Sequence, residues 1–373
     1  MRNAGPQEPI STAPRAGEET GEAAIRAAFA RQGKASAELG SPFMAALMFG
    51  LAGAVRPGDP VSDALLAWPG RPFADALPLR IAGGLHALAR AGTRPALSAA
   101  WSAPPPFSPE TLAGAAMQAF AEDPDALLPW LASPPQTNEP GRSAILLGGA
   151  LVAAARHKMP FELLEIGASA GLNLLFDRYA YDLGPENGGE RSWGPADAPR
   201  FACTWSGAAP DLSAPLSITS RAACDLNPVD ASDPAARARM LAYVWPDQHA
   251  RRARVEAALA LAAAAPPPEA ADAADWIAAR LAAPQATGTA RLAVHTIMRQ
   301  YVPEATRAAI DAAFAGAGAR ATAAAPLLRL SLEPDGRAPG ASIRLQTWPG
   351  GRTEFLGRGC YHGRWADWAP RAA

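Results

Sequence analysis

Several features are scarce in this chain of 373 residues, and each scarcity excludes a class of protein. Cysteine occurs only three times, which excludes a disulfide framework, and no two cysteines have the C-x-x-C spacing typical of zinc sites. Neither sign of charge dominates, because 34 Lys and Arg residues are balanced by 35 Asp and Glu residues. This balance argues against electrostatically driven binding to nucleic acids or membranes.

Long apolar runs are also missing. The longest, from Ala144 to Ala155, is shorter than the ~18–20 residues that span a bilayer. The first residues lack the apolar core of a secretory signal. We therefore expect a cytoplasmic protein with no membrane or nucleic-acid partner. Hydrophobic residues make up 49% of the chain, which is enough for a large core, and the length allows two domains.

The sequence pattern divides the chain into three parts. Residues 1–20 are rich in Pro, Gly and Glu without periodicity, which is typical of a disordered tail. Residues 21–139 have apolar residues at helical spacing and predict an all-helical N-terminal domain. In it, Ser41-Pro42 and Ser108-Pro109 combine an N-cap serine with a first-turn proline, which predicts helix starts. Residues 140–373 alternate between strand and helix patterns.

That alternation predicts an α/β fold with a mostly parallel sheet. Residues 342–347 and 353–360 flank a Pro-Gly-Gly turn and predict a C-terminal antiparallel hairpin. Residues 184–215 are rich in Gly, Pro and Trp and predict an irregular insertion with one strand, from Arg200 to Trp205. The other predicted strands are 161–166, 216–224, 291–298 and 327–333, and the predicted helices are 138–157, 172–181, 233–243, 247–264, 275–281 and 303–315.

The most informative segment is LLEIGASAGLN, residues 163–173. It predicts a strand, a tight turn of small residues from Gly167 to Gly171, and then a helix. We call residues 167–171 the glycine turn. A strand, turn and helix in this order present backbone N–H groups and a helix N-terminus to a ligand.

One interpretation of the glycine turn is the G-x-S-x-G nucleophile elbow of α/β-hydrolases, with Ser169 as the nucleophile. Asp225 or Asp272, followed by His295 or His362, has the required chain order. Two observations disfavour this interpretation. The preceding segment predicts helices rather than the earlier strands of a hydrolase sheet, and no HGGG-type oxyanion segment precedes the turn.

The other interpretation is the first loop of a nucleotide-binding Rossmann unit, written E-x-G-x-S-x-G. Ser169 occupies the second glycine position of the dinucleotide fingerprint, which disfavours NAD. The pattern resembles motif I of class I S-adenosylmethionine-dependent methyltransferases. That resemblance implies that the acidic residue, Glu165, lies near the amino-acid end of the cofactor, with Gly167, Ala168 and Gly171 close to it. Asn173 follows within one helical turn.

A carboxylate at the end of a following strand is needed to accept the ribose hydroxyls. Asp225 ends the strand pattern SITSRAACD and has this position, although its distance from Gly167 far exceeds the usual ~20 residues. An equal alternative is that Asp225 caps a turn in D-x-N-P. Asp272 is the candidate for the adenine end of the cofactor, after a third strand that the pattern supports poorly.

Further candidates surround these positions. His295 ends a predicted buried strand, where open α/β sheets bind ligands. We predict that His295 is the general base and that Arg299 and Tyr301 assist it, with Gln300 as a substrate contact. A structural role is the alternative for a single histidine.

The start of the helix before the first strand supplies another group. Asn138, Glu139 and Arg142 are predicted to contact the substrate or cover the cofactor, and the alternative for Glu139 and Arg142 is an ion pair on the helix face. Glu333 ends another strand, where it either faces the same cleft or caps a turn.

Long segments of the chain resemble one known family. They are LLEIGASAGLNLLFDRY, QTNEPGRS, CDLNPVDASDPAARARMLAYVWPDQ, VHTIMRQYVP and LSLEPDG. Together they resemble the bacterial domain-of-unknown-function 2332 family, from about residue 20 to the C-terminus. The family has no established activity and a methyltransferase-like fold, so the resemblance implies a Rossmann-like class I methyltransferase-type sheet.

The residues and the resemblance together predict a methyltransferase that uses S-adenosylmethionine and a small-molecule acceptor. No metal site is predicted. Two alternatives stay open at this point, a serine hydrolase at Ser169 and a binding protein that retains the fold without catalysis.

Overall fold

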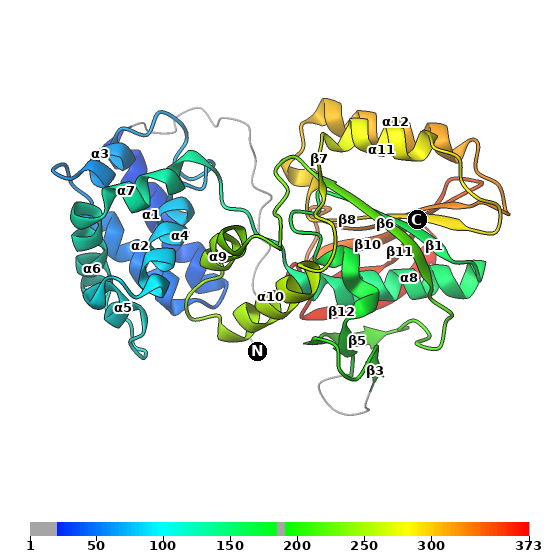
Figure 1. Cartoon of the computed structure of the whole chain (residues 1–373), viewed down its shortest axis with the longest axis horizontal. Coiled ribbons are helices and arrows are strands. Elements are labelled where there is room, and N and C mark those ends of the chain that lie inside the picture. The colour runs from blue at the N-terminus through cyan, green and yellow to red at the C-terminus, as the bar shows by residue number, and fades with distance from the viewer. Residues whose placement is uncertain (1–20, 185–190, 373) are drawn as a thin grey trace. The chain divides into compact units, whose positions relative to one another are not determined.

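The computed structural model describes residues 21–184 and 191–372, and the chain separates into two compact units (Figure 1). The helical unit contains the described residues up to Thr137 together with Ala238–Ala253. The sheet unit contains the described residues of Asn138–Arg237 and Arg254–Ala373. The sequence-based division at residue 139 did not include the return of Ala238–Ala253 to the helical unit. The predicted disordered tail, residues 1–20, lies outside the described residues.

Helices account for the regular structure described in the helical unit. The Ser41 hydroxyl accepts the Met44 N–H (3.2 Å) and the Ser108 hydroxyl accepts the Thr111 N–H (3.1 Å), which confirms both predicted helix starts. The helices are α1 (Glu22–Glu38), α2 (Pro42–Ala54), α3 (Pro60–Leu66), α4 (Leu77–Ala91), α5 (Pro95–Trp101), α6 (Pro109–Glu122), α7 (Pro124–Leu127) and the 3-10 helix η1 (Leu128–Ala132), with parts of α9 (Pro234–Ala242) and α10 (His249–Ala262).

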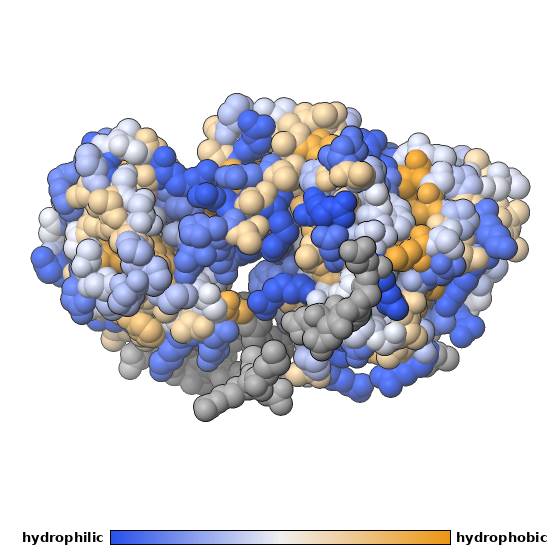
Figure 2. All heavy atoms as spheres, turned by 90° about the horizontal axis from the view of Figure 1, so that it is seen from below, coloured by the Kyte–Doolittle hydropathy of each residue, from blue (hydrophilic) through white to orange (hydrophobic). Residues whose placement is uncertain are grey.

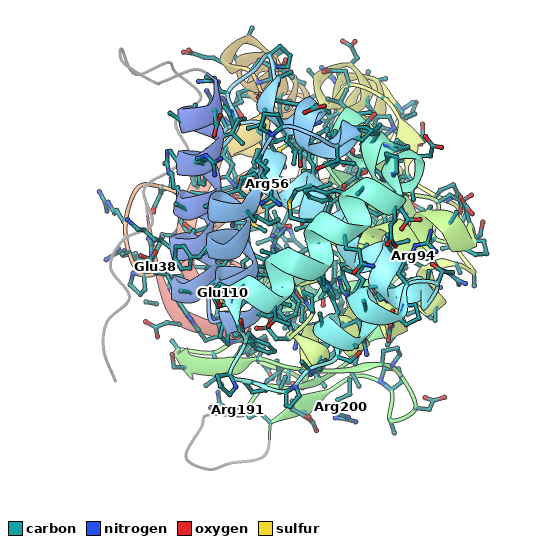
Figure 3. The ribbon with its side chains drawn as sticks, turned by 90° about the vertical axis from the view of Figure 1, so that its left-hand side faces the viewer. Glu38, Arg56, Arg94, Glu110, Arg191 and Arg200 are labelled. Carbon is teal, nitrogen blue, oxygen red and sulfur yellow. The ribbon has the colours of Figure 1, made fainter. Side chains whose placement is uncertain are left out.

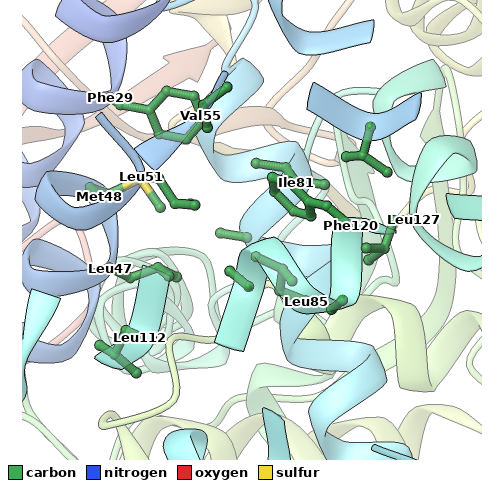
Figure 4. Close-up of a cluster of buried hydrophobic side chains, with 14 of the residues drawn as sticks. Phe29, Leu47, Met48, Leu51, Val55, Ile81, Leu85, Leu112, Phe120 and Leu127 are labelled. Carbon is green, nitrogen blue, oxygen red and sulfur yellow. The ribbon is translucent and has the colours of Figure 1, made fainter. Parts of the chain in front are cut away.

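Apolar side chains from several of these helices meet in one core (Figure 4). Leu51 of α2, Ile81 of α4 and Phe120 of α6 are fully buried there. Charged side chains such as Glu38 and Arg56 lie on the outside of the unit (Figure 3). The helical unit therefore has a hydrophobic core of its own.

The returning segment, Ala238–Ala253, is tied into the helical unit by hydrogen bonds and packing. The Asp247 carboxylate accepts the Ser41 hydroxyl (2.6 Å) and the Phe43 N–H (3.0 Å). His86 Nδ1 of α4 donates to the Ala242 carbonyl (3.0 Å). His86 is only 4% exposed, and burial lowers its pKa to about 4 because water no longer solvates the imidazolium.

This histidine makes the stability of the protein depend on pH. The unfolded chain takes up a proton near pH 6.5, but the folded chain does so only near pH 4. The free energy of unfolding should therefore decrease by about 3 kcal/mol as the pH falls through this window. Urea unfolding at pH 7 and pH 4.5 should show a smaller decrease for His86→Gln. His249→Gln, at an exposed position of α10, should behave like the native protein. Equal decreases for the native protein and His86→Gln would contradict the prediction.

The sheet unit is built on a nine-stranded sheet in the described residues, with order β5-β12-β11-β10-β9-β8-β1-β6-β7. The five strands from β9 to β7 are parallel, and β9 to β12 form an antiparallel meander. This confirms a mixed α/β fold and the predicted hairpin. The strands are β1 (Phe161–Ile166), β2 (Ala180–Asp182), β3 (Ser192–Trp193), β4 (Arg200–Ala202), β5 (Thr204–Gly207), β6 (Ile218–Asp225), β7 (Glu269–Ala270), β8 (Ala290–Thr296), β9 (Leu327–Glu333), β10 (Ala341–Trp348), β11 (Arg352–Gly359) and β12 (Trp365–Ala372).

Helices cover both faces of this sheet (Figure 1). On one face, α11 and α12 pack in a cluster that includes Ile166, Ile277 and Phe314. On the other face lies α8, which packs so closely that a methyl group added at Gly148 would overlap the Trp368 ring of β12. The remaining helices of the sheet unit are η2 (Pro140–Arg142), α8 (Ser143–His157), η3 (Asn173–Arg178), α11 (Ala273–Ala282), η4 (Arg299–Tyr301) and α12 (Glu304–Gly318).

The predicted insertion contains more strand than expected. The single strand predicted from Arg200 to Trp205 is divided at Cys203 into β4 and β5, which belong to different sheets. β4 pairs with β2 in a small three-stranded sheet of order β3-β2-β4, while β5 lies at the edge of the large sheet. Residues 185–190 lie outside the described residues.

The helix predicted for residues 172–181 is wrong. The structure has the 3-10 helix η3, interrupted at Leu175 (φ −100°, ψ 18°), followed by β2. Two buried tyrosines explain this difference. The Tyr179 hydroxyl donates to the Leu172 carbonyl (2.8 Å) and the Tyr181 hydroxyl to the Phe176 carbonyl (2.6 Å). These bonds take carbonyls that an α-helix would use, so no α-helix begins at the glycine turn.

Candidate functional site

The candidate site lies where the parallel strands end. From β1 the chain continues outward to β6 and β7, and then returns past β1 to β8 and β9. The strand order therefore reverses between β1 and β8. Ligands of open α/β sheets bind outside the carboxyl ends of the strands at such a reversal. The glycine turn follows β1 at this point.

Left-handed backbone at three positions shapes the glycine turn. The φ angles are 70° at Gly167, 54° at Ser169 and 69° at Gly171. Glycine adopts this region without strain, whereas serine does so at some cost. Met298, which follows β8, faces Gly167, and a Cβ atom added at Gly167 would lie 2.9 Å from the Met298 Cβ. Side chains other than hydrogen are therefore excluded at Gly167 by both space and conformation.

The protein itself uses most of the N–H groups of the glycine turn. Within the turn these bonds are Ala168 N to Cys224 O (3.0 Å), Ser169 N to Asp225 Oδ2 (2.8 Å) and Gly171 N to Ala168 O (2.8 Å). Just after the turn, Leu172 N donates to Asn138 Oδ1 (2.8 Å) and Leu174 N to Gly171 O (3.2 Å). A phosphate cradle presents such N–H groups to the ligand. The turn therefore has few backbone donors left for a phosphate-bearing nucleotide.

Several buried polar side chains around the turn, in contrast, have atoms without a hydrogen-bond partner among the described residues. Glu165 is 2% exposed, Ser169 is 6% exposed and Asn173 is fully buried. Glu165 Oε2, Ser169 Oγ and both amide atoms of Asn173 have no hydrogen-bond partner among the described residues. Buried polar atoms are almost always paired in folded proteins, so this group of exceptions makes the turn the candidate ligand site.

Among these side chains, Glu165 has a strongly raised pKa. Burial and, to a smaller extent, the neighbouring Asp225 carboxylate raise the pKa of Glu165 to about 8, against the opposing effects of Arg142 and the Leu174 N–H. Below this pH the carboxyl is mainly protonated. A cation placed beside it would favour its ionised form.

The start of α8 lies against the glycine turn. Asn138, 5% exposed, accepts the Leu172 N–H through Oδ1. Arg142 donates to the Tyr361 carbonyl (2.8 Å), lies 3.5 Å from the Thr296 hydroxyl and interacts electrostatically with Glu165. The structure thus brings Asn138 and Arg142 to the predicted cofactor residues.

Glu139 belongs to the same segment but is turned toward other partners. It is 1% exposed, its Oε1 accepts the Gly141 N–H (3.0 Å), and Arg254 Nη2 lies 3.8 Å from that oxygen. The ion pair between Glu139 and Arg142 on a helix face stays an alternative. A substrate role for Glu139 stays a prediction.

The two aspartates assigned to the cofactor both act as caps in this structure. Asp225 accepts the Ser169 N–H through Oδ2 (2.8 Å) and the Asn227 N–H through Oδ1 (2.9 Å), so it fixes the glycine turn and its own D-x-N turn. Asp272 is the N-cap of α11 and accepts the Ala274 N–H (2.8 Å). Asp225 lies at the site, and its carboxylate oxygens keep further lone pairs that could accept ribose hydroxyls.

His295 is fully occupied by protein contacts. Its Nδ1 donates to Glu333 Oε1 (2.7 Å) and its Nε2 accepts from Arg329 Nε (3.1 Å). His295 is 1% exposed, and burial lowers its pKa, so the ring is neutral. Glu333 also accepts the Met298 N–H (3.2 Å) and the Arg299 N–H (3.4 Å). The histidine and Glu333 therefore hold the turn that places Met298 against Gly167.

The other residues predicted near His295 lie on η4, directly after β8. Arg299 makes a two-pronged ion pair with Asp311 (2.8 and 2.9 Å). Gln300 is half-buried, and Tyr301 is 69% exposed. The catalytic roles of His295, Arg299 and Tyr301 and the substrate role of Gln300 stay predictions.

The geometry gives no support to a serine hydrolase. The φ of Ser169 does suit the strained turn of a nucleophile elbow. However, Ser169 Oγ has no hydrogen-bond partner among the described residues, so no histidine is bonded to it as a base. His295 directs both ring nitrogens to Glu333 and Arg329 instead.

Two contributors to the site were not predicted from the sequence. Arg329 fixes the His295 ring from the middle of β9, and Met298 closes over Gly167. The sequence around Arg329 does not indicate this contact, because Arg329 reaches His295 only through the pairing of β8 with β9. Met298 was within a quoted motif, VHTIMRQYVP, but its hydrophobic side chain suggested only core packing.

Three further features concern the described residues as a whole. Polar residues make up much of the face shown in Figure 2, with apolar ones interspersed. None of the helices described has both the length and the hydrophobicity needed to cross a bilayer. Within residues 21–184 and 191–372, no three His, Cys, Asp or Glu side chains are grouped as metal ligands.

Comparison with known proteins identifies the family of this α/β protein. Residues 26–368 match the family described as "Uncharacterized protein conserved in bacteria (DUF2332)". The chain belongs to this family, as its motifs suggested. No curated protein and no solved structure matches the chain.

Proposed function

We propose that the protein is an S-adenosylmethionine-dependent methyltransferase that acts on a small-molecule acceptor. The observation that carries this proposal is the group of buried, unpartnered polar atoms of Glu165, Ser169 and Asn173 around the glycine turn. These atoms fit the amino-acid end of the cofactor. Asp225 at the end of β6 would accept its ribose hydroxyls.

Two further observations support this ligand over a nucleotide. The glycine turn has few free N–H groups, which suits a cofactor without phosphates. The strand order β7-β6-β1-β8-β9 agrees with the 3-2-1-4-5 order of doubly wound sheets, in which the first strand leads into the binding turn.

The cofactor would supply the methyl group, and the chain's own residues would position both reactants. Methyl transfer is an in-line displacement, so holding the acceptor in line is the main task of the protein. An acceptor that must lose a proton would need a base. The sequence predicts His295 for that role, and its contacts with Glu333 and Arg329 favour a positioning role.

Substitution of Gly167 should abolish binding of S-adenosylmethionine. In Gly167→Val the new side chain would meet Met298 and be strained at a φ of 70°. We expect calorimetric titration to give heat with the native protein and none with Gly167→Val. Asp225→Ala should weaken binding, because it releases the Ser169 N–H as well as the ribose contact.

The matched control is Gly92→Val in the helical unit. Gly92 has nearly the same φ, 72°, and open space around it, so this variant has the same backbone strain without touching the site. It should bind like the native protein. No heat with the native protein at high micromolar S-adenosylmethionine would contradict the proposal. Labelling of Ser169 by a fluorophosphonate probe would favour the hydrolase instead.

A further inference from the structure

Five residues of the sheet unit form a closed ring of hydrogen bonds. Asp311 of α12 accepts two bonds from the Arg299 guanidinium (2.8 and 2.9 Å) and one from Arg329 Nη1 (2.7 Å). Arg329 Nε donates to His295, and His295 donates to Glu333. Glu333 in turn accepts the Arg299 N–H (3.4 Å), which closes the ring. The ring therefore ties α12 to β9, β8 and η4.

The ring determines where the His295 side chain carries its proton. The Arg329 guanidinium stays protonated and can only donate, so His295 Nε2 must be the acceptor of their bond (3.1 Å). A neutral imidazole then carries its proton on Nδ1, which donates it to Glu333 (2.7 Å). Arg329 is held in this orientation by Asp311 and by the ring of Phe314, whose centroid lies 4.5 Å from the guanidinium carbon.

Asp311 differs from the buried members of the ring because its side chain is 48% exposed. Ion pairs at such positions contribute little to the free energy of unfolding, since water competes for both charges. Burial opposes the ionisation of Asp311, but the bonds from Arg299 and Arg329 outweigh it and lower its pKa to about 2. The carboxylate thus holds two guanidinium groups, one from η4 and one from β9, at fixed positions.

The other side of the ring holds the backbone that covers the glycine turn. Glu333 accepts the Met298 N–H (3.2 Å) as well as that of Arg299. Ile297, just before them, has a φ of 52°, which a branched side chain adopts only when surrounding contacts impose it. The Met298 Cβ lies 2.9 Å from the position of a Cβ at Gly167. The place of Met298 therefore depends on the orientation of the Glu333 carboxylate.

We propose that Asp311 is a positioning residue of the candidate site, although it is half-exposed on α12. Its carboxylate acts through the ring on Met298, the side chain that closes over the glycine turn. This role goes beyond the proposed function, because it concerns the geometry of the site without any ligand. Only its consequence for the affinity for S-adenosylmethionine rests on that function. The alternative role is an ion pair that acts only at the surface.

Nuclear magnetic resonance of the full chain measures the place of Met298 without a ligand. Methionine methyl groups and glycines are protonated in an otherwise deuterated protein, and the Met298 signal is assigned by its loss in Met298→Leu. We expect a nuclear Overhauser effect between this methyl group and the Gly167 α protons, because Met298 Cε lies 3.4 Å from the position of a Cβ at Gly167. Asp311→Asn should lose most of this effect.

The nitrogen chemical shifts of the His295 ring are a second measurement, assigned by their loss in His295→Gln. In the native protein Nδ1 should have the shift of a protonated nitrogen and Nε2 that of an unprotonated one. In Asp311→Asn the two shifts should move toward each other, because Arg329 no longer fixes the proton on Nδ1. An aspartate that acts only at the surface would leave both shifts unchanged.

Three variants separate positioning from a simple loss of charge. Arg329→Lys keeps the positive charge, but one ammonium group cannot replace the separate bonds to Asp311 and His295, so it should change both measurements as Asp311→Asn does. Asp311→Glu keeps the carboxylate and should retain the native signals. Asp182→Asn is the matched control, because Asp182 of β2 is 56% exposed and pairs with Arg200 (2.8 Å). It should leave both measurements unchanged.

Calorimetric titration gives the consequence for binding. Asp311→Asn should weaken the affinity for S-adenosylmethionine by about 3- to 10-fold, whereas Asp182→Asn should not change it. Native signals in Asp311→Asn, or altered signals with native affinity, would overturn the role of Asp311. If the native protein does not bind S-adenosylmethionine, the proposed function is overturned, and the two spectroscopic measurements alone decide whether Asp311 positions Met298.

Discussion

Replacing Glu333 by glutamine is expected to lower the free energy of unfolding by about 1–3 kcal/mol. The carboxylate receives three donors, His295 Nδ1 and the N–H groups of Met298 and Arg299. Glutamine offers one acceptor oxygen, and its amide hydrogens would face the remaining donors. At least one buried N–H group would then lose its partner. Urea unfolding monitored by tryptophan fluorescence measures the loss.

The same substitution should also weaken S-adenosylmethionine binding. Glu333 holds the turn in which Ile297 has a φ of 52° and Met298 faces Gly167. Without this carboxylate the strained turn should relax away from the glycine turn. The affinity for S-adenosylmethionine, measured by calorimetry, therefore tests this role, because replacing a glutamate that only stabilises the fold elsewhere would leave the affinity unchanged.

Glu354→Gln is the control for both measurements. Glu354 of β11 is 8% exposed, close to the 7% of Glu333. Its partners are the side chains of Arg156 and Arg352, which can still donate to the oxygen of a glutamine. We expect a smaller loss of stability and unchanged affinity. Equal effects of the two substitutions would contradict the role assigned to Glu333.

Alanine at Gly148 should destabilise the protein, although alanine is the better helix former. In an open helix the change from glycine to alanine stabilises by about 1 kcal/mol. At Gly148 the new methyl group would overlap the ring of Trp368, which is itself packed edge-on against Trp205 with ring centroids 5.2 Å apart. Such overpacking typically costs about 1–3 kcal/mol, so we expect a net loss of stability.

Gly114→Ala should have the opposite effect on stability, as measured by the midpoint of thermal unfolding. Gly114 lies on α6, is exposed and has no atom within 4 Å of an added Cβ. This variant should raise the midpoint of thermal unfolding, whereas Gly148→Ala should lower it. A stabilising effect at Gly148 would mean that α8 does not pack against β12 as closely as described.

Elements whose signals are local could be predicted from the sequence. Ser41 and Ser108 are followed by proline and cap helices by themselves, and β1 is a short apolar run that ends at a glycine. Strand β12 was missed, because Pro370 argues against a strand. Pro370 is tolerated there since β5 pairs only with Trp365–Trp368, and a bulge interrupts the pairing with β11 near this position.

The candidate site was predictable only where its residues share one segment. Glu165, Ser169 and Asn173 lie in one short segment, and their grouping followed from its pattern. The partners of His295 did not, because Glu333 and Arg329 reach it through the pairing of β8 with β9. Whether a ring nitrogen of a histidine is available to a ligand depends on such tertiary contacts, and the spacing of residues in the sequence does not show them.

The return of Ala238–Ala253 to the helical unit limits how this protein can be divided genetically. Cutting the chain after Thr137 would remove the bonds of Asp247 and Ala242 from the helical unit and expose part of its core. The helical unit therefore depends on residues that follow the first part of the sheet unit in the sequence, and the two units should be expressed as one chain.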